Sequence, residues 1–362
     1  MRTRAFSVPS LLVVALLVGP AAQADQYPSL NANYAQQIYT GPLVPNQEAG
    51  MAWTFGGNLL TRNGSNINEY SLTASAVHQA TNVHPVQTTH SIAGLNTSGY
   101  GMTNGLDGYV YTVTGSGLQR FDPSNWAAPA QTLTGTVGGA GYGITTLPDG
   151  RIAYSDGSGA SSVWIYTPNA NPNLGTNTLV YSTNFLIDGM VAGPTGAIAL
   201  AGQSNSSIAI ITSSGSLIQS FSTPHYPDGM AFGDDPTTGT LYSNNNDGTI
   251  SKYVLGPGYT GSPSISDIAT GSGAYGDLAS VGPDCAFYVT QYDNGGYHGS
   301  TAGVGTNWNA GTNNEGSITR IAELGLDGTE ICGFYSPFES PEPTSLLLLG
   351  AGGLALLRNR RS

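Results

Sequence analysis

Short runs of alternating apolar and polar residues, separated by turns, make up most of the chain from residue 50 onward. Typical runs are Tyr109–Val113, Ser162–Tyr166 and Ser207–Ile211, which are rich in β-branched and aromatic side chains. The turns between them are built from glycine, proline and aspartate, as in Pro148-Asp149-Gly150. This pattern is typical of short β-strands joined by tight turns, and it predicts an all-β protein.

A motif of glycine followed by methionine or isoleucine recurs along the chain, and strand runs follow it in a fixed order. After each copy come a turn, a second strand, a third strand and a weaker fourth. The copies lie 40 to 51 residues apart, and the sixth is degenerate: Gly50-Met51, Gly101-Met102, Gly143-Ile144, Gly189-Met190, Gly229-Met230 and Gly276-Asp277. Four short strands in each period of about 40 to 50 residues are the signature of a β-propeller blade.

Six such units predict a six-bladed β-propeller with four-stranded antiparallel blades, formed by residues 25–338 as one domain. A single blade cannot bury both of its faces, so the ring has to close on itself. We expect residues 36–40 to supply a strand to the last blade and thereby latch the ring. The alternatives are a β-sandwich, which gives no reason for a repeat, and a right-handed β-helix, whose turns are much shorter than these units.

The repeat also predicts which residues share one face of the ring. The residue before each motif glycine is expected at the mouth of the central channel, where a ligand would bind. In chain order these residues are Ala49, Tyr100, Tyr142, Asp188, Asp228 and Tyr275. Neighbouring carboxylates repel each other unless a cation or a shared proton lies between them, and Ca²⁺ prefers oxygen ligands. Asp188 and Asp228 are therefore candidate ligands of Ca²⁺ or another divalent cation; the alternative is that each carboxylate caps the turn that follows it.

The sequence Pro227-Asp228-Gly229-Met230 resembles the blades of the NHL and gluconolactonase-like propellers, and the resemblance extends over about residues 100–320. In gluconolactonase-like enzymes the equivalent aspartate binds a divalent metal and acts as the general base. The resemblance therefore implies that Asp228 is the catalytic residue of a lactonase and that Asp188 is a neighbouring metal ligand. The family has a glutamate ligand in its first blade, where this chain has Ala49, with Glu48 one residue away.

The composition excludes two other classes of protein. Of 362 residues, 51 are glycine and only 9% are charged. The exposed faces of helical proteins need more Glu, Lys and Arg than this. Disordered chains have few aromatic residues, whereas this one has 20 Tyr, 9 Phe and 4 Trp. The chain is therefore expected to fold around a core.

Residues 1–24 have the order of a secretory signal peptide. Arg2 and Arg4 precede an apolar stretch at 11–18, and Ala22-Gln23-Ala24 forms a small-residue cleavage site. We expect a signal helix that is removed after Ala24. The apolar stretch is too short for the alternative, an N-terminal membrane anchor.

Residues 339–362 contain the tripeptide Pro341-Glu342-Pro343, an apolar segment at 344–357 and a basic cluster at 358–361. A helix over 344–357 is about 21 Å long, which is short of the ~30 Å hydrocarbon core and suits a removable sorting helix. These three parts in this order resemble the PEP-CTERM sorting signal. The resemblance implies processing by an exosortase-type protease, transient membrane contact through 344–357, and delivery to the cell surface or extracellular polysaccharide of a Gram-negative bacterium. A plain C-terminal anchor is the alternative.

Removal of both terminal signals makes the chain more acidic. Residues 25–343 hold five basic residues against all 22 acidic ones, a formal net charge of −17. Because phosphate binding needs a basic patch, a nucleic-acid partner is excluded and anionic lipid is disfavoured. Cations, neutral sugars such as an extracellular polysaccharide, or a basic surface protein remain as partners.

Cys285 and Cys332 are the only cysteines, and both fall in the last predicted blade. An exported chain folds in an oxidising compartment, so we expect a disulfide between them. Two buried free thiols are the alternative.

These features lead to three hypotheses about function. The one we favour is an exported propeller of the cell surface or extracellular matrix that binds a partner, a glycan or structural cations without catalysis. The second is a metal-dependent lactonase or esterase of the gluconolactonase-like type, with Asp228 as its base. The third is a structural matrix protein without a defined ligand. The sequence has no nucleotide-binding loop, nucleophile elbow or metalloprotease motif.

Overall fold

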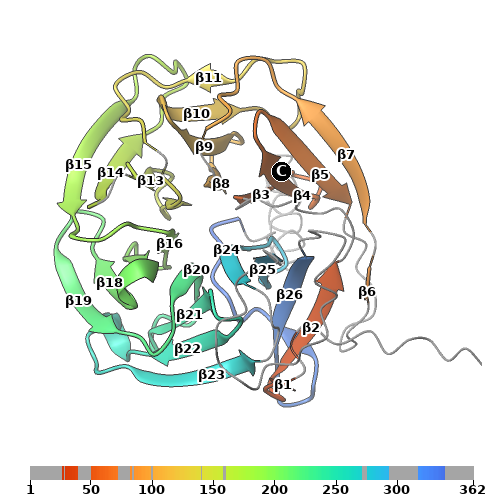
Figure 1. Cartoon of the computed structure of the whole chain (residues 1–362), viewed down its shortest axis with the longest axis vertical. Helices are drawn as coiled ribbons and strands as arrows, with labels where there is room; N and C mark the ends of the chain where they lie inside the picture. The colour runs from red at the N-terminus through yellow and green to blue at the C-terminus, as the bar shows by residue number, and fades with distance from the viewer. Residues whose placement is uncertain are drawn as a thin grey trace, which may run out of the picture.

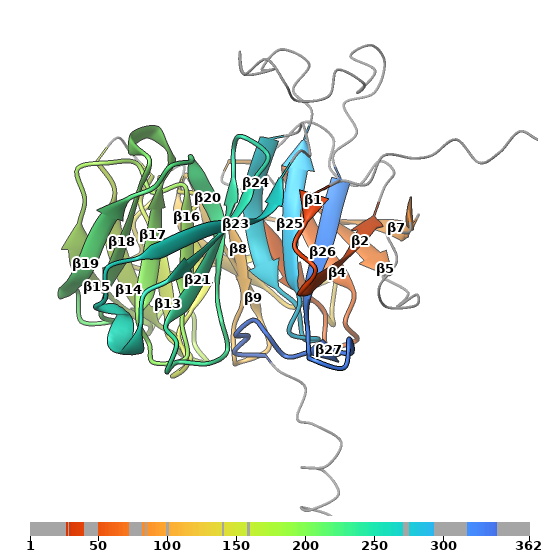
Figure 2. The same ribbon diagram turned by 90° about the horizontal axis from the view of Figure 1, so that it is seen from below.

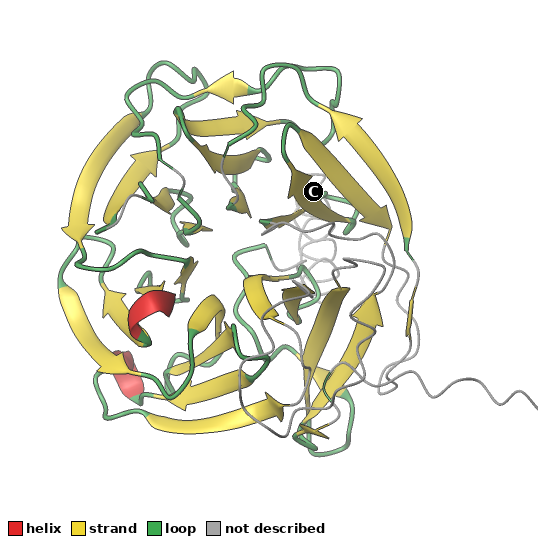
Figure 3. Cartoon of the chain, in the orientation of Figure 1, coloured by secondary structure: helices red, strands yellow, loops and turns green. Residues whose placement is uncertain are grey.

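The chain forms a closed ring of six antiparallel sheets around a central axis, so the predicted six-bladed propeller is confirmed (Figure 1). The computed structural model describes residues 27, 29–39, 50–71, 82–83, 85–98, 101–139, 141–157, 160–270, 275–292 and 317–338. Regular structure in these ranges is strand, apart from two 3-10 turns at Gln203–Asn205 and Pro257–Tyr259 (Figure 3). No helix within the described ranges is long and apolar enough to span a membrane. The helices predicted in 1–24 and 339–362 lie outside the described residues.

Each blade runs from an inner strand beside the axis to an outer strand at the periphery. The strands are β3 (Met51–Trp53), β4 (Leu59–Asn63), β5 (Asn66–Ser71) and β7 (Val86–Ser91) in blade 1; β8 (Met102–Asn104), β9 (Val110–Thr114), β10 (Gly117–Phe121) and β11 (Gln131–Thr132) in blade 2; β12 (Ile144–Thr146), β13 (Ile152–Ser155), β14 (Ser162–Thr167) and β15 (Thr176–Ser182) in blade 3; β16 (Gly189–Ala192), β17 (Ile198–Gly202), β18 (Ser207–Ile211) and β19 (Leu217–Ser222) in blade 4; β20 (Pro227–Phe232), β21 (Thr240–Asn245), β22 (Ile250–Val254) and β23 (Ser264–Thr270) in blade 5; and β24 (Tyr275–Val281), β25 (Phe287–Tyr292) and β26 (Ser317–Leu324) in blade 6.

The N-terminal part of the chain closes the ring. Strand β2 (Tyr34–Tyr39) pairs antiparallel with β26, from Tyr34 opposite Glu323 to Tyr39 opposite Ile318, and completes blade 6. The predicted latch is therefore confirmed. A second attachment was not predicted: β1 (Ser29–Leu30) adds a fifth strand to blade 5 by pairing with β23. Two short strands extend blade 6, with β6 (Asn82–Val83) parallel to β2 and β27 (Glu330–Ile331) paired with β26.

The expected disulfide is present in blade 6. Cys285 and Cys332 are bonded, with their Cα atoms 4.9 Å apart. Cys285 lies in the turn two residues before β25, and Cys332 directly follows β27. The bond therefore ties the last described segment of the chain to the blade that β2 completes.

The core consists of apolar layers between neighbouring blades. Strand β17 lies between two such layers, which explains why its sequence is almost wholly apolar. Ile198 and Leu200 pack toward blade 3, whereas Ala199 and Ala201 pack toward blade 5. Successive side chains of a strand point to opposite faces, and here both faces are buried. Strand β17 therefore places large residues toward blade 3 and small residues toward blade 5.

Two faces of the ring carry different connections. The face that we call upper carries the turns between second and third strands and the connections from one blade to the next. The face that we call lower carries the turns between first and second strands and between third and fourth strands (Figure 2). This division follows from the antiparallel order of every blade.

Candidate functional site

The centre of the ring is narrowed by large apolar residues that lie one or two positions after the motif glycines. All six blades contribute a large apolar side chain to the cavity wall: Met51, Met102, Ile144, Met190, Met230 and Leu278. The cavity has a volume of about 20 Å³, which is room for one or two water molecules. Pockets for small-molecule ligands usually measure about 300–1,000 Å³. A ligand of that size therefore does not fit inside the inner ring.

The motif glycines explain why the inner ring is so narrow. A Cβ atom on Gly101 would clash with the carbonyl oxygen of Tyr142 in the next blade, and one on Gly189 would clash with the carbonyl oxygen of Asp228. Only glycine allows this contact between the backbones of adjacent inner strands. The repeated glycine is thus a packing requirement of the ring.

Three of the five tyrosine and aspartate residues predicted at the rim have described side chains: Tyr142, Asp188 and Asp228. Tyr100 lies outside the described residues, and nothing is described of the side chain of Tyr275. Tyr142 is half-buried, while Asp188 and Asp228 are 7% and 6% exposed. Asp188 directly precedes the inner strand of blade 4, and Asp228 lies within the inner strand of blade 5. These positions agree with the repeat.

Asp188 has an unusual environment for a carboxylate. Burial raises its pKa to about 6, and a hydrogen bond from the backbone N–H of Gln203 to Oδ2, at 3.2 Å, only partly opposes this effect. The backbone N–H of Asp188 itself donates to the carbonyl of Ala201 at 3.0 Å. The capping alternative expected a donor in the turn that follows Asp188, but the donor Gln203 belongs to the 3-10 turn after β17.

The described residues contain no group of three or more His, Cys, Asp or Glu side chains arranged to hold a metal ion. Ala49 and Glu48, which occupy the position of the family's first-blade ligand, lie outside the described ranges. Asp188 and Asp228 by themselves supply two carboxylates. Binding of a divalent cation by these two residues therefore stays a prediction.

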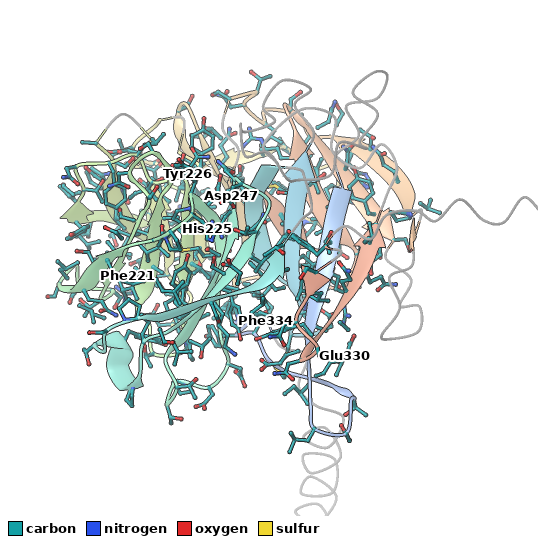
Figure 4. The ribbon with its side chains drawn as sticks, turned by 60° about the horizontal axis from the view of Figure 1, so that its bottom comes forward. Phe221, His225, Tyr226, Asp247, Glu330 and Phe334 are labelled. Atoms are coloured by element: carbon teal, nitrogen blue, oxygen red, sulfur yellow. A yellow bond between two sulfur atoms is a disulfide. The ribbon has the colours of Figure 1, made fainter. Side chains whose placement is uncertain are left out.

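A second polar cluster on the upper face was not predicted. Nδ1 of His225 lies 2.5 Å from a carboxylate oxygen of Asp247, and Figure 4 shows the two residues close together. Nε2 of His225 lies 3.2 Å from a carboxylate oxygen of Asp267. Hydroxyl groups hold both carboxylates in place, since Thr249 Oγ1 donates to Asp247 at 2.7 Å and Ser251 Oγ donates to Asp267 at 2.9 Å. The cluster joins the connection before β20, the turn after β21 and the strand β23.

These neighbours favour the charged form of the His225 imidazole. The hydrogen bond with Asp247 raises the pKa of His225, and the charges of both aspartates add to it, whereas burial opposes the shift. Burial raises the pKa of Asp247, but hydrogen bonds from His225 and Thr249 outweigh this and leave it lowered. An imidazolium donates from both ring nitrogens, which matches an acceptor on each side. The sequence signal for this cluster was the end of the second strand of blade 5, which places Asp247 on the same face as Asp228.

All five basic side chains of the ring bind other groups of the same chain. Arg62 is 4% exposed and donates to the carbonyls of Ser98 and Val113, both at 3.1 Å. Arg120 is 1% exposed and donates to the carbonyls of Asn169 and Ala170 in blade 3, also at 3.1 Å.

The other three basic residues pair with acids or aromatic rings. Arg320 bonds Asp284 at 2.8 Å and both carboxylate oxygens of Glu330 at 2.8 and 2.7 Å. Arg151 pairs with Asp149 at 2.8 Å, and Lys252 lies 3.1 Å from the hydroxyl of Tyr34. These five are all the basic residues of 25–343. The surface of the ring therefore presents acidic side chains without a basic patch.

No protein-family model and no curated protein matches the chain. Solved structures with similar folds include the PQQ-bound aldose sugar dehydrogenase of Streptomyces coelicolor, at 14% identity and a TM-score of 0.52 over 81% of this chain and 100% of that one. Another is virginiamycin B lyase of Staphylococcus aureus, at 13% identity and a TM-score of 0.51 over 80% and 99%. A gluconolactonase of Xanthomonas campestris matches at 17% identity and a TM-score of 0.42 over 54% and 68%, too low to carry an argument. These likenesses define the class of the chain, which is a six-bladed β-propeller with the architecture of such lyases and dehydrogenases. They say nothing about its activity.

Proposed function

We propose that the chain is an exported propeller of the cell surface or extracellular matrix that binds neutral or cationic partners and is non-catalytic. The observation that carries the proposal is the internal use of all five basic side chains of 25–343, against 22 acids in the same segment. Polyanions find no counter-charge on such a surface. A neutral extracellular polysaccharide or a basic surface protein is compatible with it.

Two features of the chain support export. The terminal segments 1–24 and 339–362 have the sequence order of a signal peptide and of a PEP-CTERM sorting tail. The Cys285–Cys332 disulfide is of the kind that persists in oxidising compartments. In the proposal, an exosortase-type protease processes the tail at Pro341-Glu342-Pro343.

Affinity chromatography on charged and uncharged polysaccharides tests which kind of partner the chain binds. We expect the secreted chain to flow through heparin–agarose at low salt and to be retained by a neutral or an amine-bearing polysaccharide. Retention on heparin that salt abolishes contradicts the proposal, because it requires a basic patch.

A divalent cation at the channel mouth is the part of the proposal that depends on Asp188 and Asp228. Calcium is expected to raise the melting temperature of the wild type and of Asp235→Asn, a control on the lower face. It is expected to have no effect on the double variant Asp188→Asn/Asp228→Asn. Melting that is insensitive to calcium and to chelator in the wild type rules out the cation.

A lactonase is the second candidate, favoured by the position of Asp228 in Pro227-Asp228-Gly229-Met230 and by the raised pKa of the neighbouring Asp188. Since the inner cavity holds only one or two waters, the substrate would have to lie above the channel mouth. Hydrolysis of simple lactones that depends on added divalent metal and is lost in Asp228→Asn would establish this activity. Absence of turnover with calcium, manganese and zinc removes it.

A further inference from the structure

Exposed apolar side chains are concentrated on the lower face of the ring. Among the described residues, ten large hydrophobic side chains are exposed. Tyr226 lies on the upper face and Leu179 in the middle of an outer strand, whereas the other eight lie at lower strand ends or in lower turns: Phe55, Val86, Leu106, Leu174, Leu217, Val254, Leu326 and Ile331. Within the described ranges, the lower face therefore carries most of the exposed large apolar side chains.

Three of these residues occupy the same position in three turns of one type. The turns at residues 54–57, 105–108 and 325–328 each close with a hydrogen bond from the fourth residue to the carbonyl of the first, at 3.0, 3.1 and 2.9 Å. The second residue of each turn is exposed, to 85% in Phe55, 48% in Leu106 and 112% in Leu326. A turn of this kind accepts most residues at that position, so the apolar choice in the neighbouring blades 6, 1 and 2 is not a demand of the backbone.

The described chain also ends on this face. Phe334 forms a β-bridge with Gly233, and the N–H of Tyr335 donates to the carbonyl of Phe232 at 2.9 Å, which holds this segment along a lower turn of blade 5. Phe334 and Glu330 lie on the side of the molecule opposite to His225 and Tyr226 (Figure 4). Only residues 339–343 separate Phe338 from the apolar segment 344–357, and five residues span at most about 18 Å.

We propose that the lower face lies against a lipid bilayer while the tail is attached, with Phe55 and Leu326 in contact with the headgroup region. This inference rests on the membrane contact of 344–357 in the proposed function. The short connection brings the bilayer to the lower face, and the apolar turn tips are the residues that meet it. Asp107 and Asp327 lie in the same turns, so the lipid that fits is one with neutral headgroups, because acidic groups are repelled by anionic lipid. The upper face then points away from the membrane and stays open to a partner.

Single introduced cysteines test this orientation in the full chain. The two native cysteines are bonded to each other, so Phe55→Cys, Leu326→Cys and Tyr226→Cys each create one free thiol for an environment-sensitive fluorophore. Tyr226 is the matched control, since it is 52% exposed on the upper face. The labelled chains are mixed with phosphatidylcholine vesicles, and flotation of the vesicles reports separately whether the chain is bound.

We expect vesicles to shift the emission of the labels at 55 and 326 to the blue and to increase it at least two-fold, with no change at 226. The increase should be smaller when a third of the lipid is phosphatidylglycerol. Chains that float with the vesicles but respond equally at all three positions overturn the orientation and leave the tail's membrane contact intact. Chains that do not float overturn the membrane contact itself, and the orientation with it.

Discussion

His225 and Asp247 are directly linked on the upper face, with Nδ1 of the imidazole 2.5 Å from a carboxylate oxygen. Because the folded-state pKa of His225 is raised above its ordinary value of about 6.5, protonation stabilises the fold. This stabilisation is complete below pH ~6.5 and is lost as the pH rises through the folded-state pKa.

We therefore expect His225→Gln to lower the free energy of unfolding by about 1 kcal/mol at pH 6 and by less at pH 9. Thermal melting of both proteins between pH 5 and 9 measures this difference. A constant difference across that range contradicts the role of the imidazolium.

Arg120 and Arg151 are predicted to differ sharply in their effect on stability. Replacing buried Arg120 with Met leaves the carbonyls of Asn169 and Ala170 without their donor, and we expect a loss of about 3 kcal/mol. Arg151→Ala removes a partly exposed ion pair with Asp149 and is expected to change stability by less than about 1 kcal/mol. Urea unfolding of both variants tests the contrast, and similar midpoints would speak against it.

Gly189→Ala is expected to destabilise the ring by about 2 kcal/mol, because the added methyl group meets the carbonyl oxygen of Asp228 in the next blade. Gly56→Ala is the matched control, since its nearest neighbour would be Thr54 Oγ1 at 3.7 Å. Differential scanning calorimetry should show a lower melting temperature for the first variant alone. Equal melting temperatures contradict the close approach.

Removal of the disulfide in Cys285→Ser/Cys332→Ser is expected to lower stability by about 4 kcal/mol, because the bond closes a loop between residues 47 positions apart. The single variants should lose the same amount, since either change breaks the bond. A reducing agent should lower the melting temperature of the wild type and leave that of the double variant unchanged. If the wild type does not respond to reduction, the bond contributes nothing.

Processing of the tail is predicted to depend on Glu342. In the source bacterium, Glu342→Ala should leave the full-length chain in the membrane fraction, whereas the conservative change Asp327→Asn, upstream of the motif, should be processed normally. Mass measurement of the released chain reports the cleavage. Normal release of the Glu342 variant would remove the sorting proposal.

The number of blades was predictable from the sequence because its signals are local, and the latch at β2 was predictable because a ring of blades has to close on itself. Each copy of the glycine–methionine motif marks an inner strand, and alternation of side chains marks the strands that follow. The positions of Asp188 and Asp228 at the inner strands followed from the same repeat. The predicted pairing of Cys285 with Cys332 needed only their number and the expected compartment.

The rest depended on contacts between segments that the repeat does not relate. The hydrogen bond between His225 and Asp267 joins residues 42 positions apart, and Arg120 reaches carbonyls 49 and 50 positions away in the next blade. Strand β1 pairs with β23 of blade 5, and nothing in its two residues predicted this pairing.

The sequence by itself determined that this is an acidic, six-bladed ring, because turn residues and the two-residue alternation act over a few positions. Only the tertiary structure decided that the inner ring leaves room for just one or two waters, that all five basic side chains of the ring bind groups within the chain, and that the exposed apolar turn tips share one face with the end of the described chain. These properties depend on which blades become neighbours when the ring closes, and no local pattern contains that information.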